Sequence, residues 1–167
     1  LTNPVAMAKA AETNGESLVR GMHNFLEDLR AGNVRMTRPE DFTVGRNLAT
    51  TPGAVVFRNR LLEVIHYAPT TDKVHAMPIV IVTPWINKFY ILDLNPKKSL
   101  VKYLTDQGFA VFITSWKNPT PEMRDVTFED YVVEGVNEAI EAARGFCGVE
   151  QVHAVGYCIG GTALSTW

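Results

Sequence analysis

The sequence is poor in cysteine and has no cluster of basic residues. It holds two cysteines, Cys147 and Cys158, among 167 residues. Its 16 lysines and arginines against 18 aspartates and glutamates give a formal net charge of −2, so no positive field is present that would attract nucleic acid. No pattern of secretion accompanies the cysteines, so a reducing compartment and two free thiols are expected.

Long apolar runs are also lacking. The longest, Ile79–Val82 with its flanks, is far shorter than the roughly 20 residues of a membrane-spanning helix. The N-terminus has no basic-then-apolar signal pattern. We therefore expect no transmembrane segment and a cytoplasmic location. With 46% hydrophobic and 20% charged residues, the composition is that of a globular protein with one sizeable core.

Residues 1–52 differ from the rest of the chain in their pattern of apolar residues. Leu18, Met22, Phe25 and Leu29 recur at helical spacing between charged side chains, which predicts an amphipathic helix that ends at Gly32. The following residues carry prolines and no sustained period. We therefore expect a helical N-terminal region over 1–52, whose apolar helix face packs on its own domain or binds a partner.

From residue 53 onward, short apolar runs alternate with helical patterns. Runs at 54–57 and 61–67 predict an antiparallel hairpin, and the β-branched run 79–83 predicts a central strand covered on both faces. Strands are then expected at 109–115 and 151–157. This order predicts an α/β fold in which a hairpin precedes parallel strands with crossover helices.

Three helices are expected between and after these strands. Asn95 and Pro96 have the character of a cap and a first helical residue, which predicts a helix that Gly108 closes. Thr127 is expected to cap a second helix, ending at Gly148. A third is expected to begin near Ile159.

The sequence Gly156-Tyr157-Cys158-Ile159-Gly160 after the last strand resembles a nucleophile elbow with cysteine in place of serine. Such a turn strains the central residue and needs small residues two positions before and after it. A thiolate at a helix N-terminus suits exchange of one thioester for another, so acyl transfer is favoured over hydrolysis. The alternative is a buried, inert cysteine.

The loop after the central strand, residues 83–90, is expected to complete the site. In this architecture one oxyanion-hole N–H comes from that loop, near Ile86, and the other from Ile159. The nearby side chains Trp85, Asn87 and Tyr90 are candidates for a substrate pocket, with loop packing as the alternative. Solvent exposure or a local ion pair is expected for Lys88 and Asp93.

All four histidines precede Cys158, whereas this fold supplies its partners in the order nucleophile, acid, histidine. His153 lies on the same strand, roughly 16 Å from the thiol at the rise of a strand. None of the histidines is therefore expected to act as the base, and no metal site is expected.

Five segments together resemble the N-terminal part of a poly(3-hydroxyalkanoate) synthase over essentially the whole chain. Two departures are Thr83, where members often have a second proline, and Lys117, where they often have arginine. The segments are Gly45–Ala49, Gly53–Phe57, Pro84–Leu94, Ser115–Pro119 and Gly156–Thr162.

This resemblance implies an incomplete α/β-hydrolase fold over 53–167, truncated after the elbow. It implies polymerisation of 3-hydroxyacyl-CoA, of short chain in class I-like members, into polyester with release of CoA, through a thioester on Cys158 and without a cofactor. The catalytic Asp and His are expected beyond residue 167, so this chain alone is expected to be inactive. Expected partners are the growing polyester chain, a second copy in a homodimer, and granule-associated proteins at the surface of polyester granules.

Two other functions remain open from the sequence. One is an esterase or polyester depolymerase of the same fold, against which the cysteine at the elbow argues. The other is a non-catalytic, granule-associated module in which Cys158 is inert.

Overall fold

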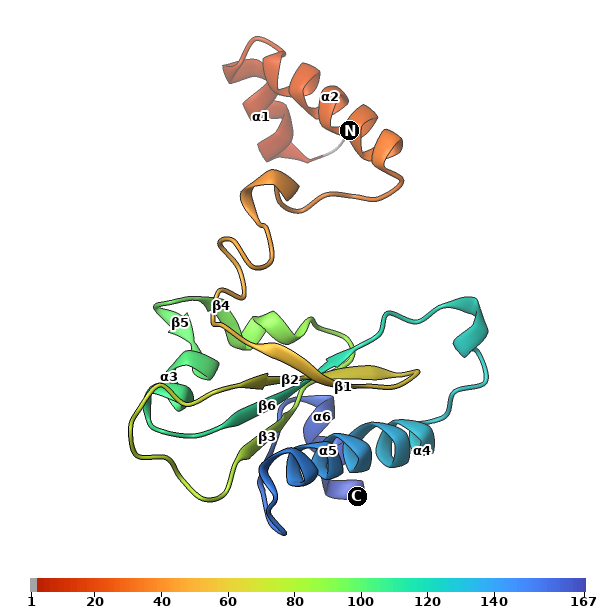
Figure 1. Cartoon of the computed structure of the whole chain (residues 1–167). Helices are drawn as coiled ribbons and strands as arrows, with labels where there is room; N and C mark the ends of the chain where they lie inside the picture. Colours follow the sequence, from red (N-terminus) through yellow and green to blue (C-terminus); the bar gives the residue numbers. More distant parts are fainter. Residues whose placement is uncertain (1–2) are drawn as a thin grey trace. The chain divides into compact units, whose positions relative to one another are not determined.

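The computed structural model describes residues 3–167, which form two compact units (Figure 1). The first ends at Phe42, and the second runs from Thr43 to Trp167. The boundary predicted from the sequence, between residues 52 and 53, therefore lies inside the second unit. The physical reason is a pair of contacts: the Ala49 N–H donates to the Asp93 carbonyl oxygen (2.9 Å), and the Thr51 hydroxyl donates to the Asp93 carboxylate (2.7 Å). That 1–52 and 53–167 are separate functional domains stays a prediction.

The first unit consists of α1 (Pro4–Glu12), α2 (Glu16–Ala31) and a short 3₁₀ turn, η1 (Pro39–Asp41). The amphipathic helix and its stop are confirmed, since Gly32 caps α2 at a φ of 71°. Helix α1 was not anticipated because its alanine-rich sequence has no apolar stripe. Its start is fixed by Asn3, whose side-chain oxygen accepts from the N–H of the second helical residue.

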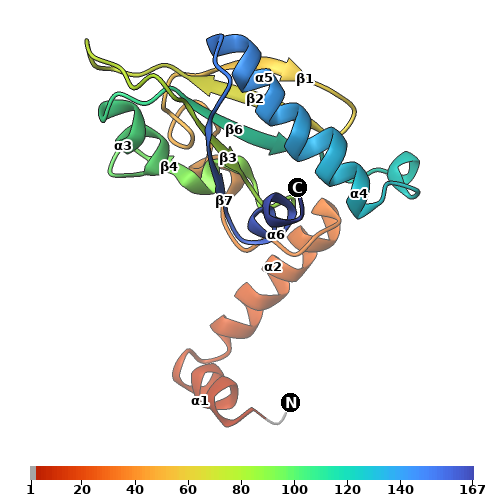
Figure 2. The ribbon, with the colours of Figure 1, turned by 90° about the horizontal axis from the view of Figure 1, so that it is seen from below.

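The second unit is built on a five-stranded sheet with the order β1-β2-β6-β3-β7 (Figures 1 and 2). Strands β1, β2 and β6 pair antiparallel, while β6, β3 and β7 pair parallel. This confirms the predicted hairpin followed by parallel strands, and with it the α/β fold class. The strands are β1 (Ala54–Arg58), β2 (Leu62–Tyr67), β3 (Ile79–Val82), β6 (Val111–Trp116) and β7 (His153–Gly156).

Helices cover both faces of the sheet, as predicted for a central strand that is buried throughout. All four residues of β3 are buried. On one face pack a nearly continuous helical rod and the elbow helix; on the other packs α3 (Leu100–Asp106). The rod consists of α4 (Phe128–Asp130), the π-helix η4 (Tyr131–Asn137) and α5 (Glu138–Cys147); the elbow helix is α6 (Ile159–Thr166).

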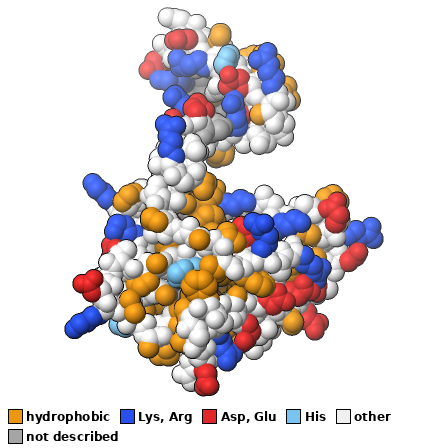
Figure 3. Space-filling model, in the orientation of Figure 1, with side chains coloured by type: hydrophobic (Ala, Val, Ile, Leu, Met, Phe, Trp, Pro, Cys, Tyr) orange, Lys and Arg blue, Asp and Glu red, His pale blue; other side chains and the backbone are white. Residues whose placement is uncertain are grey.

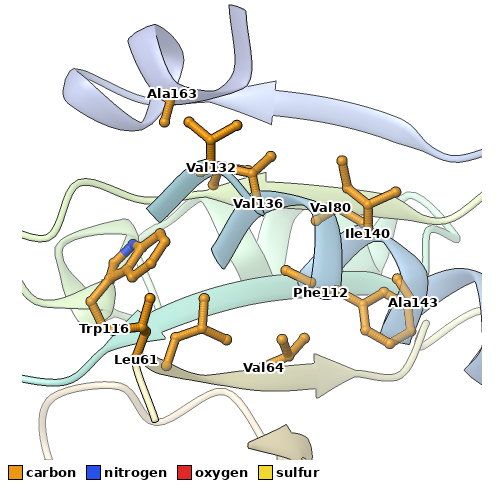
Figure 4. Packing of buried hydrophobic residues seen from close by; sticks show 13 residues of the cluster. Leu61, Val64, Val80, Phe112, Trp116, Val132, Val136, Ile140, Ala143 and Ala163 are labelled. Atoms are coloured by element: carbon orange, nitrogen blue, oxygen red, sulfur yellow. The ribbon is translucent and has the colours of Figure 1, made fainter. Parts of the chain in front are cut away.

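The larger core lies between the sheet and the rod (Figure 4). Figure 4 shows Leu61, Val64 and Phe112 on the sheet side, with Val136 and Ile140 of the rod above them. Each of these five side chains is at most 2% exposed. Burial of such side chains contributes roughly 1.5–3 kcal/mol each, which holds the rod and the sheet in one register.

The helix predicted to start at Asn95 starts later, and this expectation was wrong. Ser99 is the cap of α3, and its hydroxyl accepts from the Lys102 N–H at 2.8 Å. The Asn95 side chain instead accepts from the Lys97 N–H at 3.0 Å, which closes a small hairpin. That hairpin is β4 (Asp93–Asn95) and β5 (Lys98–Ser99), preceded by the 3₁₀ turn η2 (Phe89–Leu92); a further 3₁₀ turn, η3 (Pro121–Met123), precedes α4.

Candidate active site

Cys158 stands on a sharp turn between β7 and α6. Its φ of 56° and ψ of −129° place a non-glycine residue in a backbone region that side chains strongly disfavour. The side chain is exposed, and the residue is the cap of α6. The thiol is therefore not buried among the described residues, and the turn has the predicted geometry of an elbow; the nucleophilic role of Cys158 stays a prediction.

The flanking glycines are required by close backbone approaches. A Cβ atom on Gly160 would lie 2.3 Å from the carbonyl oxygen of Val82, at the end of β3. A Cβ atom on Gly156 would meet the backbone of Gly161 and of Gly160 within 3.0 Å. These positions therefore exclude any side chain, which is the physical basis of the small-residue pattern in the sequence.

The N-terminus of α6 presents one unused donor beside the thiol. The amides of Gly160 and Gly161 bond to the carbonyl oxygens of Tyr157 and Cys158, at 3.0 and 2.9 Å. The Ile159 N–H has no acceptor among residues 3–167. Orphan N–H groups at a helix N-terminus stabilise negative charge, so this donor suits an oxyanion.

The loop after β3 begins beside the elbow and is held there by buried hydrogen bonds. Thr83 is fully buried; its hydroxyl donates to the carbonyl oxygen of Thr114 (2.6 Å), and its N–H donates to the Thr114 hydroxyl (2.9 Å). The Trp116 indole N–H donates to the Thr83 carbonyl oxygen at 2.7 Å. Because the Tyr157 N–H donates to Val82, the starts of the loop and of the elbow share one edge of the sheet.

The predicted residues of this loop lie in different environments. Ile86 is 74% exposed, and its N–H is likewise without an acceptor in the described part of the chain. Trp85 packs on the core, with its ring centroid 4.5 Å from that of Tyr131. Asn87 is exposed, and Tyr90 makes an edge contact with Phe89. The oxyanion and pocket roles of these residues stay predictions.

The expectation that Asp93 is exposed or ion-paired was wrong. It is 1% exposed, and its carboxylate accepts from the Thr51 N–H (3.2 Å) and hydroxyl (2.7 Å). The burial of Tyr67 and, as the smaller cause, the nearby charge of Asp93 raise the pKa of Tyr67. Lys88 is exposed and donates to the Asn118 side chain, which links the loops that follow β3 and β6.

The three histidines of the second unit lie in contacts or at positions that separate them from Cys158. His66 lies between Phe112 and Phe146, with ring centroids 4.8 and 4.6 Å away, and burial lowers its pKa. His75 stacks on Phe109 at 3.9 Å. His153 pairs with Ile79 at the opposite end of β7 from Cys158. The other thiol, Cys147, is partly buried at the end of α5, and its burial raises its pKa.

The sequence did not predict that Thr114 and Trp116 hold the start of the loop after β3. The segment Ser115–Pro119 was identified only as part of a family pattern. No signal in one sequence could assign them, because their partners lie 31 and 33 residues away. Within residues 3–167, no three His, Cys, Asp or Glu side chains cluster as metal ligands would, and no helix has the length and apolar character to cross a membrane.

The sequence is also similar to a known protein family and to individual members of it. A family described as "Poly-beta-hydroxybutyrate polymerase (PhaC) N-terminus" matches residues 1–104. The chain is 47% identical over 165 residues to the poly(3-hydroxyalkanoate) polymerase subunit PhaC of Cupriavidus necator. It is 49% identical over 169 residues to the poly(3-hydroxyalkanoate) polymerase of Methylorubrum extorquens. Both matches cover 99% of this chain and 28% of the relative, so the chain spans just over a quarter of their length.

Among solved structures, the chain is similar to epoxide hydrolase A from Mycobacterium thermoresistibile. The TM-score is 0.48 at 14% sequence identity, covering 69% of this chain and 34% of that one. So distant a likeness indicates no function.

Proposed function

Because the chain belongs to the poly-beta-hydroxybutyrate polymerase (PhaC) family, we propose that it supplies the nucleophile and oxyanion hole of an acyltransferase that polymerises 3-hydroxyacyl-CoA. The observation that carries the proposal is the exposed Cys158 on its strained turn. The two relatives named above are polymerases by name. The substrate we propose is a short-chain acyl-CoA such as 3-hydroxybutyryl-CoA.

In the proposed reaction, the thiolate sulfur of Cys158 attacks the thioester carbonyl carbon of the acyl-CoA. The carbonyl electron pair moves to oxygen, and the N–H groups of Ile159 and Ile86 donate to this oxyanion. Collapse of the intermediate breaks the bond to CoA. CoA leaves as a thiolate that takes up the proton lost by the cysteine, and the acyl group remains on Cys158.

The second step forms the polyester bond. The hydroxyl oxygen of another 3-hydroxyacyl-CoA attacks the Cys158 thioester, and its proton returns to the cysteine sulfur. The product is an acyl-CoA longer by one unit, which can acylate Cys158 again. No cofactor is required in this proposal, since CoA is part of the substrate. A general base outside this chain activates the thiol, a contribution on the order of 10²–10⁴-fold.

The test is capture of the acyl-enzyme. The full-length polymerase that contains residues 1–167 is mixed with 3-hydroxybutyryl-CoA, quenched in acid and digested for mass spectrometry. We expect a 3-hydroxybutyryl group on the peptide with Cys158 and free CoA in solution. Cys158→Ala should abolish both, while the matched control Cys147→Ala should retain both, since Cys147 lies at the far end of α5.

The outcomes separate the competing functions. Polymer accumulation by Cys158→Ala at the rate of the parent protein would overturn the proposal and favour a non-catalytic module. Hydrolysis of preformed polyester to free 3-hydroxy acid, with no polymer made from the acyl-CoA, would instead indicate an esterase or depolymerase.

For partners and location, we propose a homodimer in the cytoplasm that works at the surface of polyester granules with granule-associated proteins. The support is α2, in which no residue is buried. Its exposed side chains Leu18, Met22, Phe25 and Leu29 form one apolar stripe. Leu18→Ser with Phe25→Ser should weaken dimerisation or granule binding in sedimentation and granule co-pelleting, whereas Arg20→Ser, off the stripe, should not.

A further inference from the structure

The helical rod changes its winding at the point where it passes the candidate site. Between α4 and α5, residues Tyr131–Asn137 form a π-helix, a rare element that inserts one extra residue into a helical turn. Three of its residues, Val132, Gly135 and Val136, are buried against the core. An extra residue rotates everything after it by about 100°, so the winding determines which side chains face the sheet.

The absence of a side chain at Gly135 leaves room for the Trp116 indole. A Cβ atom on Gly135 would lie 2.4 Å from the Cη2 atom of Trp116 and 2.7 Å from its Cζ3 atom. The indole therefore rests directly on the π-helical backbone. In this position it is 8% exposed, and its N–H reaches the Thr83 carbonyl oxygen at 2.7 Å.

The first residue of the π-helix holds the next part of the loop. The Tyr131 ring lies 4.5 Å from the Trp85 ring and 5.2 Å from the Trp116 ring, centroid to centroid. Trp85 also meets Trp116 edge to face at 5.5 Å. Aromatic pairs at these separations attract one another beyond their shared burial. The residue after Trp85 is Ile86, whose backbone N–H is the proposed donor from this loop.

The same π-helix also contacts α6, which carries the other proposed donor. Ala163 of α6 is fully buried and points toward Val132 of the π-helix (Figure 4). At the other end, the Trp167 indole N–H donates to the Asn137 side chain at 3.1 Å. One short segment thus touches both the loop with Ile86 and the helix with Ile159.

On its outer side the π-helix is fixed by the turn between β1 and β2. The Asn59 side chain donates to the Glu134 carbonyl oxygen at 2.7 Å, and the Arg60 guanidinium binds the Glu134 and Asp130 carboxylates. Acidic and basic side chains gather over this end of the second unit in Figure 3. The Arg60 hydrogen bonds lower the pKa of Glu134. The π-helix is thereby held from both sides.

We propose that the π-helix Tyr131–Asn137 is a positioning element for the oxyanion hole, with Gly135, Trp116 and Tyr131 as positioning residues. Through Trp116 and Tyr131 it sets the loop that carries the Ile86 N–H, and through Val132 it sets α6, which carries the Ile159 N–H. The inference rests on the proposed function. None of the three residues touches the thioester; their effect is the relative placement of two donors.

Gly135→Ala tests this, with Gly145→Ala as the matched control on the same rod. A Cβ atom on Gly145 would meet no atom within 4 Å, whereas the Gly135 methyl displaces the Trp116 ring. In the full-length polymerase we expect Gly135→Ala to lower kcat for 3-hydroxybutyryl-CoA roughly 10- to 100-fold with little change in KM, since misplaced donors weaken transition-state binding. Gly145→Ala should match the parent.

Alkylation by iodoacetamide separates the oxyanion hole from the thiol itself. This substitution at carbon forms no oxyanion, so Cys158 of Gly135→Ala should be alkylated within about twofold of the parental rate, while its acylation slows with kcat. A Gly135→Ala protein that acylates at the parental rate would overturn the proposal. So would acylation and alkylation that fall together, which would indicate a general loss of the elbow.

A second variant serves if Gly135→Ala does not fold. Trp116→Phe keeps an aromatic ring but removes the donor to the Thr83 carbonyl oxygen, and we expect the same split between slowed acylation and unchanged alkylation. Parental kcat in folded Trp116→Phe would overturn the proposal. Failure of the proposed function looks different: Cys158→Ala would then keep its activity, whatever these variants do.

Discussion

Gly156 and Gly161 meet backbone to backbone across the elbow: a Cβ atom added to Gly156 would lie 2.4 Å from the Cα atom of Gly161. Neither partner can yield by rotating a side chain, because both contacts are backbone. The turn therefore tolerates no methyl group, and its fit can be tested by stability alone.

Gly156→Ala is expected to destabilise the second unit by about 1–3 kcal/mol, the usual range for overpacking a filled site. Gly145→Ala, in the last turn of α5, has free space and is expected to stabilise it by up to ~1 kcal/mol, because alanine favours helix over glycine. Urea denaturation followed by circular dichroism measures both. Equal midpoints for the two variants would contradict a tight elbow.

Cys158→Gly is expected to be more stable than Cys158→Ala by about 1 kcal/mol. Both variants lack the thiol, but only glycine adopts a φ of 56° with a ψ of −129° without strain, and part of that gain is offset by its greater freedom when unfolded. Thermal unfolding of the two variants side by side gives the difference. If alanine proves equal or better, the turn stores no strain.

Asp93→Ala is expected to destabilise the protein by about 1–3 kcal/mol, since it leaves the partly buried Thr51 N–H and hydroxyl without their acceptor. Thr51→Val removes one of the two donors and is expected to cost less. Chemical denaturation ranks them. A neutral Asp93→Ala would contradict its assignment as the anchor of residues 43–52.

Because of His66, the free energy of unfolding is expected to decrease as the pH is lowered below neutrality. Burial lowers the folded pKa of His66 below the ordinary 6.5, so the neutral ring is favoured in the folded state. Its contribution is complete above pH 6.5 and is lost as the pH falls from there toward the folded pKa, because the unfolded chain takes up the proton first. His66→Gln should flatten the melting temperature in this range; an unchanged slope would exclude His66 as the cause.

A polypeptide limited to residues 1–167 is expected not to release CoA from 3-hydroxybutyryl-CoA. His66 and His75 pack against aromatic rings, and His153 lies at the opposite end of β7 from Cys158, so none of the three is placed to serve as general base for Cys158. A thiol-sensitive dye detects free CoA. Catalytic release, above one equivalent per chain, would show that a base is present within these residues.

The order of elements could be predicted from the sequence because each strong signal is local. The Val-Ile run of β3, the glycine cap of α2 and the glycines around Cys158 each determine their own backbone conformation. The start of α3 was predicted wrongly because Asn95 and Pro96 suit a helix start as well as a tight hairpin. The hairpin that forms is held in part by Thr51, whose contact with Asp93 spans 42 residues and is not visible in the local sequence.

The surroundings of the site were much less predictable. The π-helical winding of 131–137 has no sequence signal of its own, since Tyr131 to Asn137 continue an apolar period that also fits an α-helix. The contact of the Trp116 ring with Gly135 forms only when β6 and the rod pack together. Packing of this kind depends on the tertiary structure, which one sequence does not reveal.

The parallel pairing of Val82 with Gly156 joins residues far apart in the chain, and it determines when the thiol takes up its geometry during folding. The β1–β2 hairpin can form early from neighbouring residues, whereas β7 can dock only after β3 and β6 have closed a long loop. Cys158 is twisted into its unfavourable conformation at that late step. The strained conformation of Cys158 therefore depends on the long-range pairing of β7 with β3 as well as on its neighbouring glycines.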